Sequence, residues 1–397
     1  FVAAQEATAS TLLRQIQDNP RLRFGKPIPY KIMGPESFAK PSLTAALSNL
    51  RREKAQPGIY SEGVYAVAPF LEDIANQRAL DFRVQYKTRN GRPAGVIAAG
   101  FHDAAAVVVD ALRGLPNDLS DIKAARREVR GHLGGLDSPD KAVSGVTGGL
   151  SFDRDGNAVK PVPIGVYHTR RLVSPPVQLS AVSSLETTNT NDVLQIYGNY
   201  FTRTNIVHAG LQINQISDID LDDHRFTADF NLWFRYHNKL DLSAIEFPNA
   251  AEPIDLGPPV EKFSEGTAFY SLHRIKGIFK TDFQPQTGSS RERLLGIQVR
   301  HRILNFERLI LVPDALGMKS HETGTLTERI ERKILFGETT NWAVDKAQMY
   351  LDTEPIATRD NPRFGGKQVE GYSRFNLGIW IKPTDLALRG LVDLDLA

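Results

Sequence analysis

Residues 226–236 read FTADFNLWFRY, and this stretch alternates between apolar and polar side chains at nearly every step. Its even positions carry Phe, Ala, Phe, Leu, Phe and Tyr, whereas its odd positions carry Thr, Asp, Asn, Trp and Arg. A period of two is that of a β-strand with one buried face and one solvated face. Trp233 is the exception, because it places a large aromatic ring on the polar face. An indole there predicts either packing within the chain or a covered binding surface.

Two further stretches toward the C-terminus, residues 295–303 and 373–381, alternate in the same way. Successive strands with polar turns that contain Gly and Pro, and with few helices, indicate an all-β antiparallel sandwich over residues 193–383. Tyr372 and Trp380 fall on the polar face of their predicted strand, as Trp233 does on its own. We therefore expect another surface to cover all three rings.

The first 173 residues mix helical and strand patterns, which indicates an α/β domain. Helical periodicity spans residues 7–17, 70–88, 101–112 and 122–133, and the Ala- and Val-rich 101–112 is expected to be buried. Asp118 and Ser120 are candidate N-caps of the last of these helices. A hairpin turn is predicted at residues 155–157, which read Asp-Gly-Asn. Residues 174–192 are rich in Ser, Thr, Pro and Asn and predict a linker, and residues 384–397 form a tail.

The composition is ordinary for a globular protein. The chain has 397 residues, of which 41% are hydrophobic and 24% charged, and its net charge of +2 gives no electrostatic reason to expect nucleic acid as a partner. Cysteine is absent, which excludes disulfides, thiolate metal sites and cysteine nucleophiles. No apolar run reaches the ~18 residues that span a bilayer. The chain begins at Phe1 in a pattern that reads as a strand end, so we expect a piece of a longer protein.

The sequence carries no signature of catalysis. G-x-S-x-G, P-loop, H-E-x-x-H and G-x-G-x-x-G motifs are all missing, so neither enzyme activity nor a cofactor is predicted. The nine histidines are scattered without metal-ligand spacing, and no metal site is predicted. The acidic run Asp218, Asp220, Asp222 and Asp223 is interpreted as a solvated loop between two strands, with a cation site as the alternative.

Residues 1–172 resemble the C-terminal half of a type I periplasmic solute-binding protein of the branched-chain amino acid class. The resemblance is carried by GIYSEGVYAVAPF at 58–70, FRVQYKTRNGRPAGVIAAGFHDAAAVVVDAL at 82–112 and VTGGLSFDRDGNAVKPVPIGVYHTRR at 146–171. It implies an incomplete type I fold, which alone would bind an amino acid weakly or not at all. The implied cleft residues are Glu36, Ser37, Phe38, Tyr65, Phe101, His102 and Asp103. The alternative is structural: Asp103 as a helix cap, Phe101 in the core and Tyr65 beneath a hinge.

Residues 193–383 resemble the extracellular domain of bacterial pentameric ligand-gated ion channels, of the Cys-loop receptor superfamily. The carrying stretches are ISDIDLDDHRFTADFNLWFRY at 216–236, IEFPNAA at 245–251, RIKGIFKTDF at 274–283, LLGIQVRHRI at 294–303 and EGYSRFNLGIWIKP at 370–383. Residues 284–294 depart from the family, because they lack the Phe-Pro-Phe-Asp of its signature loop. The resemblance implies an aromatic ligand site for a cationic or amphipathic molecule, with Phe247, Phe306, Tyr350 and Tyr372 on one subunit and Trp233 supplied by the neighbouring subunit.

Taken together, the two resemblances imply an extracytoplasmic module that binds and senses a small molecule. The intact protein would be anchored in a membrane by segments outside this chain, would assemble as a homo-oligomer, and would act as a receptor or a ligand-gated channel. The alternative is the solute-binding component of an amino-acid-type ABC importer, in which the β-domain is an accessory.

Overall fold

The computed structural model describes residues 6–19, 31–71, 73–74, 76–92, 94–115, 121–138, 141–159, 162–181, 193–196, 199–220, 222–281, 292–314, 326–332, 342–357 and 369–383. The chain divides into two compact units, Phe1–Thr202 and Arg203–Ala397. This division falls later than the boundary predicted at Val193, and residues 177–181 of the predicted linker form a strand, β8 (Val177–Ala181). Residues 182–192 of that linker and the predicted tail lie outside the described residues.

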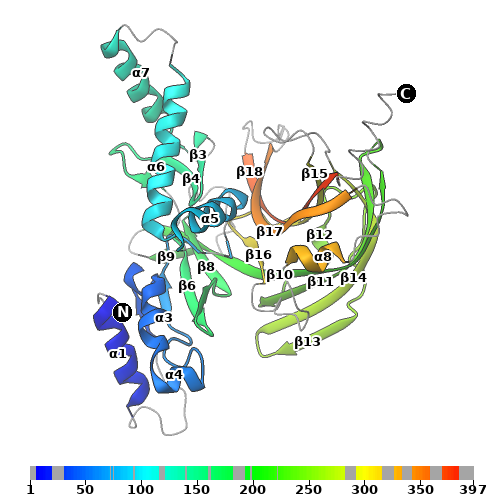
Figure 1. The fold of residues 1–397 in the computed structure, drawn as a ribbon, viewed down its shortest axis with the longest axis horizontal. Coiled ribbons are helices and arrows are strands. Elements are labelled where there is room, and N and C mark those ends of the chain that lie inside the picture. Colours follow the sequence, from blue (N-terminus) through cyan, green and yellow to red (C-terminus); the bar gives the residue numbers. More distant parts are fainter. Residues whose placement is uncertain are drawn as a thin grey trace. The chain divides into compact units, whose positions relative to one another are not determined.

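The first unit combines helices with two small sheets (Figure 1). Its helices are α1 (Glu6–Asp18), η1 (Glu36–Ala39), α3 (Pro41–Ser48), α4 (Arg51–Ala55), α5 (Gln77–Asn90), α6 (Val96–Arg113) and α7 (Ile122–Gly135). One sheet has the order β1 (Met33–Gly34), β2 (Tyr65–Val67), β6 (Ile164–His168), β7 (Arg171–Val173), in which β1 and β2 are parallel. The other has the order β3 (Val143–Gly145), β4 (Gly148–Phe152), β5 (Ala158–Val159). The type I binding-protein architecture for this unit stays a prediction.

The helix predicted over residues 70–88 begins later than expected, at Gln77. The side chain of Asn76 caps it by accepting a hydrogen bond from the Ala79 amide (2.9 Å), which defines the first turn. Asp73 lies before the helix, where its buried carboxylate accepts hydrogen bonds from the backbone N–H (2.6 Å) and the hydroxyl of Ser174. The hairpin between β4 and β5 is confirmed, and Asp153 closes it by accepting from the amides of Asp155 and Asn157.

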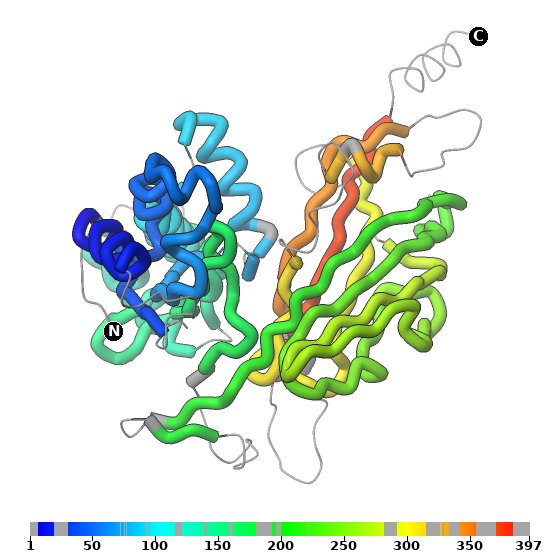
Figure 2. The backbone as a smooth tube through the Cα atoms, turned by 90° about the horizontal axis from the view of Figure 1, so that it is seen from below, coloured from blue at the N-terminus to red at the C-terminus, as the bar shows by residue number. Residues whose placement is uncertain are grey.

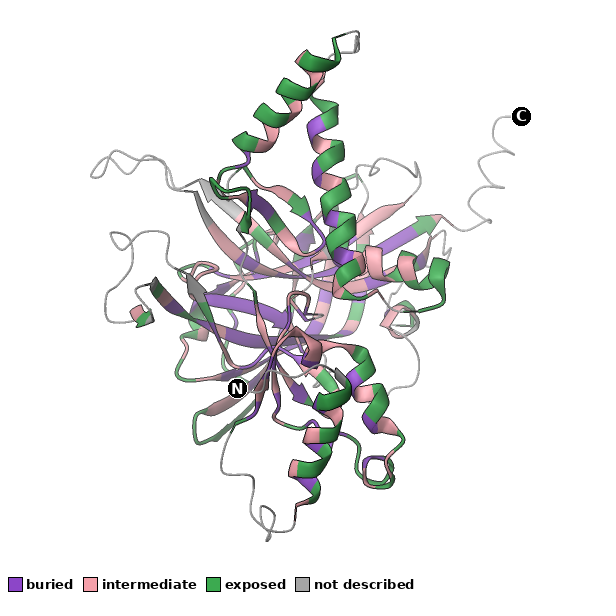
Figure 3. Ribbon diagram, turned by 90° about the vertical axis from the view of Figure 1, so that its left-hand side faces the viewer, coloured by how far each residue is buried: buried purple, intermediate pink, exposed green. Residues whose placement is uncertain are grey.

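Helix α6 exists as predicted over residues 101–112, but the expectation that it is buried is wrong. Among its residues Ala99, Asp103, Val107 and Ala111 are buried, a single stripe at helical spacing. The opposite face is open to solvent, and Phe101 is 76% exposed (Figure 3). Helix α7 is also confirmed, but its N-cap is Asp121, which accepts from the Ala124 amide (2.9 Å); Asp118 and Ser120 lie outside the described residues.

The second unit is a β-sandwich of two sheets that face each other across one core (Figure 2). The larger sheet has the order β13 (Glu261–Glu265), β14 (Ala268–Lys280), β11 (Arg225–His237), β10 (Asn199–Asp220), β16 (Leu309–Pro313). The start of β10, which pairs with β9 (Val193–Ile196), belongs to the first unit. The smaller has the order β12 (Ile245–Glu246), β15 (Arg293–His301), β18 (Val369–Pro383), β17 (Trp342–Ala357). The sandwich also contains η5 (Leu242–Ala244) and α8 (Leu326–Glu331). Its strands are antiparallel except for β10 and β16, which run parallel.

Strand β11 lies near the centre of the larger sheet and confirms the predicted alternation residue by residue. Every even position from Phe226 to Tyr236 is buried, and every odd position between them is half-buried. Phe230 is fully buried, and its ring meets those of Phe247 (6.0 Å between centroids) and Phe279 (5.9 Å). Burial of an aromatic side chain contributes a few kcal/mol to the free energy of folding, so this strand is a main source of the stability of the sandwich.

Asn249 joins the two sheets through all of its amide atoms. Its Nδ2 donates to the carbonyls of Lys280 in β14 (2.9 Å) and Gly296 in β15 (2.6 Å), and its Oδ1 accepts from the amide of Gln298 (3.0 Å). An amide that satisfies backbone groups of both sheets fixes their relative position at this end of the sandwich. The residue that carried part of the channel resemblance therefore has a structural role here.

Side chains of the second unit itself contribute to the cover of the three aromatic rings that were expected to meet another surface. Trp380 is 5% exposed, and the Nζ of Lys346 lies 4.4 Å from the centre of its ring. Tyr372 is half-buried and faces the guanidinium of Arg300 at 5.9 Å. Trp233 is likewise half-buried within its own unit. Cross-strand neighbours supply this cover, and strand pairing is not visible in the alternation of one strand.

Within the part of the chain that the structure describes, none of the helices is both long enough and apolar enough to cross a membrane.

Replacement of Phe230 by Ala should destabilise the second unit by about 3–5 kcal/mol, because it removes a fully buried ring between two others and leaves a cavity. Denaturant unfolding followed by circular dichroism measures this loss. Thr227→Ala, on the half-buried face of the same strand, is the matched control and should cost less than about 1 kcal/mol. Equal costs for the two variants would contradict the assignment of the buried face.

Stability should fall as the pH drops below about 6.5, because several histidines are buried as neutral rings. The His301 Nδ1 accepts from the amides of Ile303 (3.2 Å) and Leu304 (3.0 Å), and burial lowers its pKa below the ordinary value of 6.5. Burial likewise lowers the pKa of His273. The unfolded chain therefore takes up protons first, so stability is complete above pH 6.5 and is lost below it.

The measurement is the free energy of unfolding from pH 8 to pH 5. In His301→Gln the slope in this range should decrease by up to about 1.4 kcal/mol per pH unit. An unchanged slope would show that His301 takes up its proton equally in both states.

Candidate functional site

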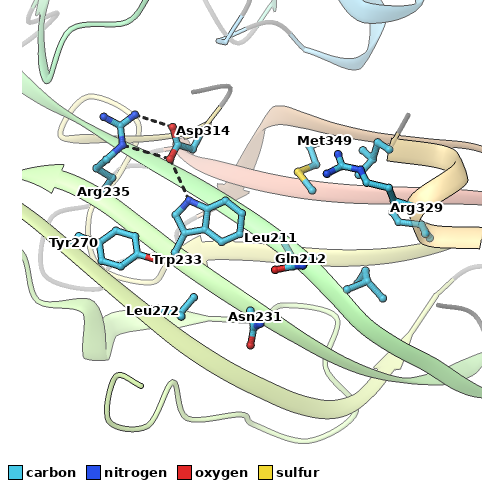
Figure 4. Close-up of a pocket in the computed structure, with 13 residues that line it drawn as sticks. Leu211, Gln212, Asn231, Trp233, Arg235, Tyr270, Leu272, Asp314, Arg329 and Met349 are labelled. Atoms are coloured by element: carbon cyan, nitrogen blue, oxygen red, sulfur yellow. Dashed lines mark hydrogen bonds and ion pairs between the residues drawn. The ribbon is translucent and has the colours of Figure 1, made fainter. Parts of the chain in front are cut away.

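A cavity of about 320 Å³ opens in the second unit beside the outer face of strands β10, β11 and β14. It is lined by Leu211, Gln212, Ile213, Asn231, Trp233, Arg235, Tyr270, Leu272, Asp314, Leu326, Arg329, Ile330 and Met349. These residues come from strands of both sheets, from the residue after β16 and from α8 (Figure 4). The volume lies at the lower end of the range for small-molecule sites, and mixed apolar and polar walls are typical of them.

The indole of Trp233 forms one wall of the cavity because its cross-strand neighbour is a glycine. Trp233 pairs with Gly210 of β10, and a Cβ atom at position 210 would overlap the indole ring. The ring therefore lies close against the backbone of β10, and a side chain at position 210 would occupy the same space. On its other side Trp233 pairs with Leu272 of β14, which adds an apolar surface beside the ring.

Asp314 fixes the orientation of that ring. Its carboxylate is 1% exposed, and it accepts hydrogen bonds from the indole Nε1 of Trp233 (3.1 Å) and from Nη2 of Arg235 (2.7 Å). Asp314 directly follows β16, and its amide donates to the Ala209 carbonyl (2.8 Å). The parallel pairing of β16 with β10 thus brings the carboxylate next to residue 210. Because both carboxylate oxygens are occupied, Asp314 holds the wall rigid.

The opposite wall comes from α8 and β17, and Figure 4 shows Arg329 and Met349 across the cavity from Trp233. Residues Leu326, Arg329 and Ile330 share one helix face, since they are spaced i, i+3 and i+4. Ile330 is 3% exposed within the core and anchors this face. The helix is also tied to β17, because the Thr327 hydroxyl accepts from the Ala347 amide (3.1 Å).

Of the five aromatic residues predicted for the β-domain site, Trp233 lines this cavity and the other four do not. Phe247 is 6% exposed and belongs to the hydrophobic core, where its ring packs edge-on against Phe279 (6.1 Å). Phe306 is half-buried in the turn before β16, and its amide donates to the Gly371 carbonyl (2.7 Å). Tyr350 is half-buried and pairs with Asn376 of β18.

Tyr372 lies in a different setting, beside a network of ion pairs on the smaller sheet. Arg300, which faces its ring, binds Glu246 (2.6 Å) and Glu354 (2.8 Å), while Arg374 binds Asp352 (2.7 Å). Charges that are this fully paired and partly exposed contribute modestly to stability. Tyr372 thus does not line the cavity beside Trp233 of the same chain, and the site in which Trp233 comes from a neighbouring subunit stays a prediction.

The residues predicted for the α/β cleft fall into two groups in the first unit. Glu36, Ser37, Phe38 and Tyr65 lie on η1 and β2, which contact each other. Phe38 is fully buried in the core, where its ring crowds Gly34, so it is no cleft residue. Tyr65 is half-buried in the strand β2, between β1 and β6. Glu36 and Ser37 are half-buried in the short helix η1.

Phe101, His102 and Asp103 form the second group, on α6. Asp103 is 3% exposed and binds the amides of Val146 (2.6 Å) and Thr147 (2.9 Å), so it ties α6 to the turn before β4 and caps no helix. The exposed Phe101 belongs to no core. The ring of His102 lies tilted against that of Phe82 (4.8 Å between centroids). His102 also lines a cavity of about 550 Å³, whose other described lining residues come from α5 and include no other predicted cleft residue.

Apart from Trp233, the lining residues were missed by sequence reasoning, among them Tyr270, Asp314, Arg329 and Met349. Tyr270 could have been found from the pairing of β11 with β14, because it lies opposite Arg235. No local pattern marks Asp314 or Arg329, which reach the site through the topology. The acidic run is only in part a loop, because Asp218 and Asp220 end strand β10 and Asp222 and Asp223 lie in a turn, where the Asp223 amide donates to Asp220 (2.9 Å). The described residues hold no group of three side chains suited to a metal ion.

A scan against protein-family models finds no match to this chain, and neither does a search of curated proteins. Among solved structures the chain is similar to AChBP from Bulinus truncatus, whose crystal structure is described in relation to the conserved scaffold of nicotinic acetylcholine receptors. The similarity covers 45% of this chain and 88% of that chain, at 10% sequence identity and a TM-score of 0.30. A similarity at this level bears on neither the ligand nor the assembly of this chain.

Replacement of Gly210 by Ala should displace the Trp233 ring, because the added methyl group occupies the space of the indole. Overpacking of this kind costs about 1–3 kcal/mol. The loss of the hydrogen bond to Asp314 should also shift the tryptophan emission spectrum.

Gly296→Ala is the matched control, since a Cβ there meets no atom within 4 Å. It should leave both the stability and the emission nearly unchanged. An unaltered emission spectrum in Gly210→Ala would contradict the packing of the indole over β10.

Proposed function

We propose that the second unit is a small-molecule binding domain and that the cavity beside Trp233 is its binding site. The observation that carries the proposal is the preformed wall: a half-buried indole packs against Gly210 and is held by the buried Asp314. Binding sites are commonly apolar clefts with a few fixed polar groups, and rigid walls lower the entropic cost of binding. Both features are present here.

The proposal is of binding rather than of catalysis. Asp314 is the carboxylate in the cavity, and Arg235 and Trp233 occupy both of its oxygens. Its role is to orient the aromatic wall and to keep Arg235 in place.

The wider setting of this binding domain is proposed from the resemblances in the sequence. The module would be extracytoplasmic and would belong to a membrane-anchored receptor or ligand-gated channel that assembles as a homo-oligomer. The α/β unit would contribute a partial cleft of the solute-binding type. The alternative, a component of an amino-acid importer, differs in locating the ligand in the α/β unit, and the two can be separated by mapping the site.

The test is a screen of small amphipathic molecules by thermal shift on the whole chain. A ligand at a hundred times its Kd stabilises the folded state by about 2.7 kcal/mol, which is readily measured. Trp233→Ala should abolish the shift for molecules that bind the cavity, whereas Tyr372→Ala should preserve it. If Tyr372→Ala abolishes binding and Trp233→Ala does not, the site is on the other sheet.

A further inference from the structure

We infer that the cavity beside Trp233 selects small amphipathic monocarboxylates, whose anionic group binds Arg329 while the apolar body lies against Trp233. The inference rests on the proposed function, and it replaces the cationic ligand suggested by the aromatic residues with an anionic one. It is carried by the state of Arg329, which the sequence did not single out.

Arg329 is a half-buried cation whose guanidinium has an unused donor. Among the described residues its buried Nε has no hydrogen-bond partner, and its guanidinium forms no ion pair with a carboxylate. A buried donor without an acceptor costs free energy, and the cost is greater for a charged group. The fold bears this free-energy cost because Arg329 shares a helix face with Leu326 and Ile330. The burial of these two apolar side chains directs that face inward.

The charges around the cavity leave Arg329 as the group to be neutralised. Among the described residues that line it, two carry a guanidinium group, Arg235 and Arg329, and one carries a carboxylate, Asp314. Asp314 is committed to Arg235 (2.7 Å) and to Trp233, so it does not compensate the charge of Arg329. One excess positive charge in a partly desolvated site attracts one negative charge, and a guanidinium matches the planar geometry of a carboxylate.

The rest of the cavity fits an apolar body. Trp233 and Leu272 stand side by side on neighbouring strands, and Met349 lies on the opposite wall with Arg329 (Figure 4). An aromatic ring and flexible apolar side chains suit an aryl or branched alkyl group. A volume of about 320 Å³ limits the ligand to a small molecule.

The experiment compares three probes that share one skeleton: 4-phenylbutyrate, 4-phenylbutyramide and 4-phenylbutylamine, which are anionic, neutral and cationic at pH 7.5. Binding to the whole chain is measured by tryptophan fluorescence and by calorimetry. The carboxylate should bind at least tenfold more tightly than the amide, and the amine more weakly still, because a hydrogen bond to a charged group typically contributes that much.

Arg329→Met keeps the apolar stem of the side chain and removes its charge. It should weaken 4-phenylbutyrate binding by about ten- to a hundredfold and leave amide binding unchanged. The melting temperature of the unliganded variant should be equal to or higher than that of the parent, because an unpaired buried donor is removed. Arg302→Met, at an exposed arginine outside the cavity, should change neither quantity.

The outcomes distinguish the ligand class from the binding function. If the amide or amine binds as tightly as the carboxylate, and Trp233→Ala abolishes that binding, the cavity is a ligand site and the inference is wrong. If Arg329→Met lowers the melting temperature of the unliganded chain and weakens all probes alike, Arg329 is structural and the inference is also wrong. If no probe binds through Trp233, the carboxylate class is overturned, and the broader screen decides the binding function separately.

Discussion

The buried aromatic face of strand β11 is the constraint on which the second unit depends. Phe226, Phe230 and Phe234 are fully buried, and they meet rings from β14 and from the chain after β12. A slip of one residue against either neighbour would bring Asp229, Asn231 and Arg235 into the core, so the register is strongly specified. The outer face of the sheet is determined by the same constraint.

The candidate site is a consequence of that register. With Phe234 and Leu232 directed inward, Trp233 must stand on the outer face, opposite Gly210. Strand β16, which is parallel to β10, then ends beside Gly210, so that Asp314 accepts a hydrogen bond from the indole. Helix α8 contributes Arg329 for an unrelated reason, because the same helix face buries Ile330 in the core. A rigid sheet thus supports one wall and a short helix supports the other, which is how a fold can hold polar groups in fixed positions.

Long-range pairing also explains where residue-based predictions about the sites succeeded and failed. Trp233 was recognised because a large ring breaks a polar alternation, a signal contained within eleven residues. Phe247 does not interrupt an alternating pattern, so the sequence gives no comparable signal. Its burial follows from its contacts with the rings of Phe230 and Phe279. Trp380 shows the same strand pattern as Trp233 but is covered by Lys346 of the neighbouring strand. In the first unit, Asp103 resembles a helix cap in sequence, yet its partners are Val146 and Thr147, far along the chain.

The sequence by itself determined the class of local structure in most places. The alternation in β11, β15 and β18, the helices α1, α6 and α7 and the hairpin at Asp153 all follow from periodicity and turn chemistry, which act over a few residues. Tertiary structure alone decided which face of α6 is exposed, where Asp314 and Arg329 lie and which aromatic residue borders a cavity. These properties depend on contacts between residues distant in the chain, such as the 81 positions between Trp233 and Asp314. The composition of a single segment holds no information about such a partner.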